Sequence, residues 1–243
     1  MMPMTLSEVA QAVGCTAEYF LNNHAKITSI STDSRPQPED EDKESCLFVA
    51  LRGEKFDGHQ YVDSALRNKA AYALVDEKGV QEYCSEISPE HLIVCKDTEQ
   101  GFLDLAGYYR NQFQFKMVGV TGSVGKTTTK EMIAQVLSAQ YETLKTQGNF
   151  NNRVGLPKTL FQLDNSIEAA VIEMGMNSFG EISDLTRRAR PDAAVITNIG
   201  VAHIEYLGSR AGILKAKMEI IEGMKEGSPL ILKKDDDMLA DLD

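Results

Sequence analysis

Residues 117–130 read MVGVTGSVGKTTTK and join a short β-branched stretch to a glycine-containing loop and the start of a helical pattern. In this order a strand leads into a loop whose backbone N–H groups meet at the N-terminus of a helix, with a lysine beside them. Such a concavity suits a polyphosphate. The segment therefore predicts the strand–loop–helix unit of an α/β protein.

The loop departs from the strict phosphate-loop pattern G-x-x-x-x-G-K-[ST], which would place glycine where this chain has Val120. The remaining glycines let the backbone approach phosphate oxygens, Lys126 can reach the β- and γ-phosphates, and the Thr127 hydroxyl can ligate Mg²⁺. The alternative is a glycine turn before an ordinary helix. We favour nucleotide binding, because this combination in this context rarely occurs by chance. The predicted nucleotide-binding residues are Thr121, Gly122, Ser123, Val124, Gly125, Lys126, Thr127 and Thr128.

Composition excludes several classes of protein. The chain has 243 residues and a net charge of −11, so a nucleic-acid partner is not expected. Its 4 cysteines show no Cys-x-x-Cys spacing, which indicates reduced thiols rather than a zinc site. No signal peptide or bilayer-length apolar run is visible. We expect a cytoplasmic monomer without membrane insertion.

The first part of the chain mixes short helical and strand-like patterns. Helical spacing covers 6–13, 61–69 and 98 to about 111, and strand-like runs cover 27–31, 46–51, 71–75 and 91–95. The polar stretch 111–114 then predicts a boundary between a domain at 1–112 and a second at 113–243.

From residue 116 onward, apolar runs at 117–120, 169–172, 193–196 and 230–232 alternate with helical stretches. This alternation predicts a parallel sheet covered on both faces, so the fold class is α/β throughout. Ligands of such sheets bind beyond the carboxyl ends of the strands. The phosphate loop, Glu173 and Thr197-Asn198 all follow strand ends.

Two strand-end residues could bind metal. Glu173 could be a ligand for the Mg²⁺ that accompanies a nucleotide, or a solvated acid at the end of a strand. His203 follows the strand at 193–196 and could serve the same site, although a lone histidine is more often a hydrogen-bonded structural residue. The sequence leaves both alternatives open.

Lys217 lies on an apolar helical stripe, at i+4 from Ile213 and i−3 from Ile220. A lysine on such a face loses hydration, which favours the neutral amine that can react with CO₂ to give a carbamate. The alternative is that Lys217 extends past the stripe to reach solvent. That alternative is the commoner one.

Two polar segments are candidates for substrate binding. Residues 148–157 read GNFNNRVGLP and hold Asn149, Asn151, Asn152 and Arg153, which form either a turn before a helix or a platform for a polar substrate. Residues 31–35 read STDSR and lie on a predicted loop. Alone, neither segment is specific.

Taken together, these motifs resemble the Mur ligases of peptidoglycan assembly. The matching stretches are TGSVGKTTT, GNFNNRVGLP, EMGM, ITNIGVAHIE and GSRAGILKAKMEI, with DSR, LFVALRG and FDGH in the first domain. The resemblance covers essentially the whole chain. The asparagine-rich element favours the member that joins D-alanyl-D-alanine to UDP-N-acetylmuramoyl-tripeptide.

The resemblance implies a role for each candidate. Lys126 and Thr127 would hold ATP and its Mg²⁺, Glu173 and His203 would position metal, and a carbamylated Lys217 would bind a second Mg²⁺. The catalytic residues would be Lys126, Lys217 and His203. Ser31, Asp33, Ser34 and Arg35 would bind the uridine nucleotide, and Asn149, Asn151, Asn152 and Arg153 would bind the muramoyl-peptide.

The resemblance also implies a reaction and a missing part. ATP would phosphorylate the terminal carboxylate of the tripeptide, and the amine of the dipeptide would displace phosphate from the acyl phosphate. Family members are about twice as long and carry a third domain, so we expect this chain to be an inactive fragment whose central domain is incomplete. Near residue 233 the family tends to have asparagine, whereas this chain has Lys233.

Two other functions remain open at this stage. Folylpolyglutamate synthase shares the phosphate loop but lacks the first domain. A P-loop GTPase or regulatory ATPase would act as a binding switch, but the guanine-recognition element Asn-Lys-x-Asp does not occur in this sequence.

Overall fold

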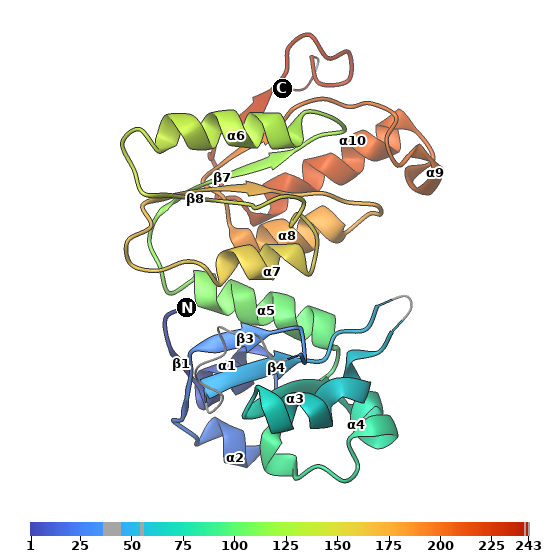
Figure 1. Ribbon diagram of the computed structural model, residues 1–243. Helices are drawn as coiled ribbons and strands as arrows, with labels where there is room; N and C mark the ends of the chain where they lie inside the picture. The colour runs from blue at the N-terminus through green and yellow to red at the C-terminus, as the bar shows by residue number, and fades with distance from the viewer. Residues whose placement is uncertain (36–44, 54–55, 241, 243) are drawn as a thin grey trace. The chain divides into compact units, whose positions relative to one another are not determined.

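The computed structural model describes residues 1–35, 45–53, 56–240 and 242 (Figure 1). Two compact units divide the chain, Met1–Leu105 and Ala106–Asp243. The division falls inside helix α5 (Thr98–Arg110), slightly before the stretch at 111–114 that the sequence suggested. No helix in the described part of the chain is long and apolar enough to cross a membrane.

The first unit contains a parallel sheet in the order β3-β4-β5-β6 and a small antiparallel pair, β1-β2. The strands are β1 (Met4–Thr5), β2 (Lys26–Ile27), β3 (Ser29–Ser31), β4 (Cys46–Val49), β5 (Tyr72–Asp76) and β6 (Leu92–Cys95). The α-helices are α1 (Leu6–Ala12), α2 (Glu18–Leu21), α3 (Val62–Asn68) and α4 (Glu77–Tyr83), with short 3₁₀ turns at Gly58–Tyr61 and Pro89–His91. The single strand expected at 27–31 is thus divided between two sheets.

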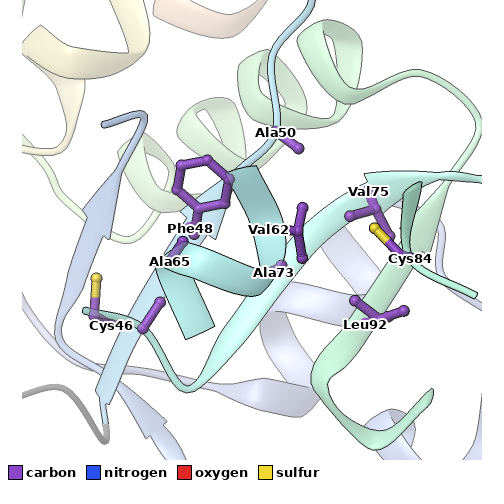
Figure 2. Close-up of a cluster of buried hydrophobic side chains, with 10 residues drawn as sticks. Cys46, Phe48, Ala50, Val62, Ala65, Ala73, Val75, Cys84 and Leu92 are labelled. Atoms are coloured by element: carbon purple, nitrogen blue, oxygen red, sulfur yellow. The ribbon is translucent and has the colours of Figure 1, made fainter. Parts of the chain in front are cut away.

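A hydrophobic cluster lies between this sheet and helix α3 (Figure 2). Phe48 from β4, Val62 and Ala65 from α3, and Ala73 and Val75 from β5 are all buried within it. The β4 stretch is buried on both faces, as the continuous apolar run in the sequence predicts for a parallel strand. All 4 cysteines are buried thiols outside any disulfide, in keeping with a structural role.

A buried polar network joins the loop after β4 to the end of β5. His59 Nδ1 lies 2.6 Å from Asp57 Oδ1, and His59 Nε2 accepts the backbone N–H of Asp76 at 3.1 Å. Arg52 pairs with both carboxylates. Burial opposes ionisation of Asp57 and Asp76, but each carboxyl has its pKa lowered below its ordinary value. Hydrogen bonds from His59 and Arg52 do this for Asp57, and hydrogen bonds from Arg52 and the N–H of Gly79 do it for Asp76.

Replacing Gly79 with alanine is expected to destabilise the first unit by about 3 kcal/mol, because a Cβ there would lie 2.0 Å from His59 Cδ2. Helix propensity alone would favour alanine by about 1 kcal/mol, so the sign of the change distinguishes the two effects. Urea denaturation measures it. The control is Gln81→Ala on the exposed face of the same helix, which should change stability by less than about 0.5 kcal/mol. A neutral or stabilising Gly79→Ala would contradict the packing described here.

The second unit contains a parallel sheet in the order β11-β10-β7-β9-β8. Its strands are β7 (Lys116–Thr121), β8 (Thr143–Lys145), β9 (Ala169–Glu173), β10 (Ala193–Ile196) and β11 (Leu230–Leu232). Its helices are α6 (Lys126–Leu137), α7 (Gly155–Leu160), α8 (Glu181–Ala189), α9 (Ile204–Leu207) and α10 (Arg210–Met218). Helix α6 lies on one face of the sheet and α7 and α8 lie on the other (Figure 1).

The sheet order brings three strand ends together. β7 pairs with β9 on one side, with Val120 opposite Glu173, and with β10 on the other, with Thr121 opposite Ile196. The phosphate loop therefore starts between the end of β9 and the end of β10. The α/β fold with parallel sheets is confirmed. The helical stripe of Ile213, Lys217 and Ile220 is divided, since α10 ends at Met218 and continues as a 3₁₀ turn, Glu219–Gly223, that holds Ile220.

Candidate functional site

The phosphate loop occupies residues 121–128, between β7 and α6. Gly125 precedes the first residue of α6 in the left-handed conformation, with φ 81°. Gly122 has φ 148°, and a Cβ there would lie 1.8 Å from Thr197 Oγ1. Both glycines are thus required by the backbone path, and the first N–H groups of α6 face the ligand position without partners inside the helix.

The segment after β10 holds the loop in place. Asn198 accepts the N–H of Ser123 through its carbonyl at 3.1 Å and the N–H of Val124 through Oδ1 at 3.0 Å. Thr197 Oγ1 donates to the carbonyl of Val124 at 2.6 Å. Gly200 N–H donates to Ser123 Oγ at 2.9 Å. The sequence placed residues 197 and 198 at this edge, but it did not indicate that they fix the phosphate loop.

Lys126, Thr127 and Glu173 lie at the centre of the site. Lys126 Nζ donates to the carbonyl of Gly122 at 3.0 Å, so the ammonium lies over its own loop. Thr127 Oγ1 donates to Glu173 Oε2 at 2.9 Å. Glu173 is buried, with 2% of its surface exposed. A hydroxyl and a carboxylate this close to a phosphate loop form an oxygen donor set that suits Mg²⁺.

The asparagine-rich segment reaches the same carboxylate. Asn151 Nδ2 donates to Glu173 Oε1 at 2.8 Å, and the carbonyl of Asn151 accepts the N–H of Gly175 at 2.8 Å. Asn152 Oδ1 instead accepts the N–H groups of Val154 and Gly155, at the start of α7. The structure therefore brings Asn151 to Glu173 and uses the oxygen of Asn152 to fix the local turn.

The two remaining residues of this segment make other contacts. The carbonyl of Asn149 accepts the N–H of Asn151 at 2.7 Å, which tightens the segment. Arg153 forms an ion pair with Asp184 of α8. The guanidinium is thus anchored on the neighbouring helix.

Lys217 is buried on α10, with 3% of its surface exposed. Burial, with a smaller contribution from the charge of Lys126, lowers the pKa of Lys217 from 10.5 to about 7. About half of the amines are therefore neutral near pH 7. The alternative in which the side chain extends to solvent is wrong, because α10 packs the stripe of Ile213 and Ile220 inward.

The stability of the second unit is expected to rise with pH between about 7 and 10.5 because of Lys217. The folded state has the lower pKa, so the unfolded state binds more protons in this window. Below pH 7 the cost of the buried ammonium reaches roughly 5 kcal/mol. Lys217→Met should therefore be more stable than wild type at pH 7 in buffer without metal or bicarbonate, by a margin that shrinks toward pH 10. Chemical denaturation at a series of pH values measures this margin. If Lys217 were hydrated, the difference in unfolding free energy between wild type and Lys217→Met would not change with pH.

His203 precedes α9 and has φ 65°, in the left-handed region that residues other than glycine rarely adopt. It is half-buried. Among the described residues, His, Cys, Asp and Glu side chains form no group of three that could hold a metal. The structure thus connects Thr127, Asn151 and Glu173 directly, but it does not join His203 to them.

The predicted uridine-binding residues lie in the first unit, at the end of β3 and directly after it. Arg35 pairs with Asp33 at 2.6 Å and lowers the pKa of that carboxyl well below its ordinary range. Ser31 Oγ donates to the carbonyl of Asp33 at 2.9 Å and accepts its N–H at 3.1 Å. Ser34 lies between them in the same turn. The segment is an ordered, solvent-accessible loop at the carboxyl end of a parallel strand.

A parallel sheet with a glycine loop at the end of its central strand, followed by a helix, defines a P-loop α/β protein. Comparison with known families is more specific. The Mur ligase middle domain matches residues 120–243, about half of the chain, and the Mur ligase family catalytic domain matches residues 26–105. The chain belongs to the Mur ligase family.

Individual relatives agree with this assignment. The chain is 42% identical over 241 residues to the UDP-N-acetylmuramoyl-tripeptide–D-alanyl-D-alanine ligase of Bacillus subtilis, covering 98% of this chain and 50% of that protein. It is 41% identical to the Escherichia coli ligase of the same name, covering 86% and 44%. The chain spans about half the length of the curated relatives it matches.

Solved structures show the same similarity. The structure of MurF from Acinetobacter baumannii matches with a TM-score of 0.86 and 35% identity, covering 99% of this chain and 51% of that one. MurF ligase from Thermotoga maritima, solved in complex with ADP, matches with a TM-score of 0.75 and 35% identity, covering 86% and 46%.

Proposed function

We propose that this chain supplies the uridine-nucleotide-binding region and an ATP-binding region of an ATP-dependent amide ligase that joins D-alanyl-D-alanine to UDP-N-acetylmuramoyl-tripeptide. The observation that carries the proposal is the joint hydrogen bonding of Glu173 to Thr127, beside the phosphate loop, and to Asn151, in the asparagine-rich segment. One carboxylate thus connects the predicted nucleotide site to the predicted peptide site. The names of the relatives at about 40% identity support the same substrates.

Lys126 and the N–H groups at the start of α6 would bind the triphosphate and neutralise charge as the γ-phosphoryl group moves to the substrate carboxylate. The Lys126 ammonium would leave the carbonyl of Gly122 to do so. Asn198 and Thr197 would keep the loop rigid, so that little reorganisation is needed on binding.

Thr127 and Glu173 would hold one Mg²⁺, and Lys217, as its carbamate, would hold a second together with His203. Bound Mg²⁺ supplies charge stabilisation for the transferring phosphoryl group. The lowered pKa of Lys217 supports the carbamate, because the neutral amine attacks CO₂ and releases a proton. These ligand assignments are part of the proposal.

The substrates would occupy two polar segments. Ser31, Asp33, Ser34 and Arg35 would bind the uridine nucleotide in the first unit, which we propose as a domain near 1–112. Asn149, Asn151, Asn152 and Arg153 would bind the muramoyl-peptide in the domain near 113–243. The chain would hold both sites in the bacterial cytoplasm as a monomer.

The reaction would proceed in two displacements. The terminal carboxylate of the tripeptide takes the γ-phosphoryl group of ATP, releasing ADP and forming an acyl phosphate. The amine of the dipeptide attacks the acyl carbon, and the tetrahedral intermediate expels phosphate and gives up a proton. Lys126 would stabilise the phosphate oxygens in both steps, so the protein contributes mainly positioning and charge.

Nucleotide preference tests the ATP-dependent ligase against a GTP-dependent switch. With Mg²⁺ present, ATP should raise the melting temperature of this chain and GTP should raise it less. A UDP-N-acetylmuramoyl-peptide should raise it further. A response to GTP but not to ATP would contradict the ligase and favour the switch.

A further inference from the structure

Lys130 is a buried cation that the mechanism above does not use. It lies on α6, one turn beyond Thr127, and only 1% of its surface is exposed. Its Nζ donates to the carbonyl of Thr146 at 2.7 Å and lies 3.0 Å from Glu131 Oε1. Burying an ammonium group is costly unless its hydrogen bonds are satisfied, so this lysine requires a structural or functional explanation.

Thr146 is the junction between the sheet and the asparagine-rich segment. It directly follows β8, is fully buried, and donates its N–H to the carbonyl of Val171 at 3.1 Å. Its Oγ1 accepts the N–H of Glu173 at 2.9 Å. The hydroxyl of Thr146 therefore positions the backbone of Glu173, and Lys130 holds the carbonyl of Thr146.

Further hydrogen bonds connect Glu173 to both α6 and the asparagine-rich segment. Its carboxylate accepts from Thr127 Oγ1 of α6 at 2.9 Å and from Asn151 Nδ2 of the segment at 2.8 Å. Lys130 joins the same helix to Thr146, just before the asparagine-rich segment begins. The stretch 146–154, which runs from Thr146 into that segment, is thus attached to the phosphate-loop helix at its start through Lys130 and near its middle through Glu173.

We propose that Lys130 is a positioning residue that fixes the stretch 146–154, and with it Glu173, relative to the phosphate loop. The charge matters because a charge-assisted bond to a buried carbonyl is stronger than a neutral one. An apolar side chain such as methionine would remove this donor from the buried carbonyl. The consequence for the muramoyl-peptide rests on the proposed function, whereas the attachment itself does not.

The contact with Glu131 offers a simpler role that can be separated. Glu131 is partly exposed and also pairs with Lys145, which is itself partly exposed. If Lys130 acted only through Glu131, then Lys145→Met would produce a similar effect. Lys145→Met is therefore the matched control, since it removes a cation from Glu131 and leaves Thr146 untouched.

Hydrogen exchange tests the attachment directly. Lys130→Met should speed amide exchange in residues 146–154 by about tenfold and leave exchange in β10 and the first unit unchanged, whereas Lys145→Met should change neither. Unchanged exchange in 146–154, or a uniform increase over the whole unit, would overturn the proposal. If Lys130→Met does not fold, Thr146→Val breaks the same path at the next bond, and the same two outcomes decide.

Kinetics on the full-length protein test the consequence for substrate. Lys130→Met should raise the KM for UDP-N-acetylmuramoyl-tripeptide about tenfold and change the KM for ATP less than about twofold, with Lys145→Met like wild type. Equal effects on both substrates would overturn a positioning role in peptide binding. If the wild-type protein shows no activity with the tripeptide but Lys130→Met still speeds exchange in residues 146–154, the proposed function is wrong and the attachment by Lys130 is supported.

Discussion

Replacing Lys217 with alanine is expected to lower kcat of the full-length protein by at least about 10³-fold while the second unit stays folded. The reason is that Lys217 is buried, with its pKa lowered to about 7, and as a carbamate it would provide a carboxylate for the second Mg²⁺. Alanine removes that ligand. Denaturation at pH 7 should show no loss of stability beyond that of an ordinary truncation, because a buried ammonium is removed as well.

The matched control for this prediction is Lys215→Ala. Lys215 lies on the same helix but is exposed, with its Nζ 5.7 Å from the centre of the Phe179 ring. It should keep activity within about twofold of wild type. Wild type in ¹³C-bicarbonate should show a carbamate resonance that Lys217→Ala lacks and Lys215→Ala keeps. A fully active Lys217→Ala would exclude the carbamate.

Replacing Lys126 with methionine is expected to weaken binding of Mg·ATP by about 100-fold or more. Methionine keeps much of the side-chain volume, so the loop conformation and the hydrogen bonds of Val124 to Thr197 and Asn198 should persist. What is lost is the ammonium that lies over the loop, at 3.0 Å from the carbonyl of Gly122. Titration calorimetry with a non-hydrolysable ATP analogue measures the change.

Lys116→Met is the control for Lys126. Lys116 is exposed at the first position of β7, whereas Lys126 follows the carboxyl end of the same strand. Its removal makes the same change in net charge but should leave nucleotide affinity within about twofold of wild type. Equal losses from the two variants would mean that affinity follows overall charge and that the loop has no specific role.

The sequence predicted those parts of the site that are set by local patterns. The phosphate loop, the strand before it and the helix after it follow from glycine spacing and apolar runs. Glu173 was placed correctly because the carboxyl ends of all strands in a parallel sheet lie at the same edge, where the phosphate loop also begins. Burial of Lys217 follows from the stripe of Ile213 and Ile220, although the sequence alone favoured a solvated side chain.

The connections between these parts could not be predicted, because they join residues far apart in the sequence. Asn198 bonds to Ser123 and Val124 because β10 lies next to β7 in the sheet. Apolar periodicity does not determine which strands are neighbours. No local pattern singles out Lys130, because its partner Thr146 follows β8 and is brought beside α6 only by the fold. β8 itself was missed because Thr143–Lys145 is short and mostly polar.

We propose that this chain is part of a ligase that uses ATP to join D-alanyl-D-alanine to UDP-N-acetylmuramoyl-tripeptide. The decisive measurement is phosphate release from ATP by the full-length protein with the UDP-linked tripeptide, with and without the dipeptide. We expect sustained release, with ligated product in equal amount, when both substrates are present, and little release without the dipeptide. Release that does not depend on the dipeptide, or that requires GTP, would contradict it.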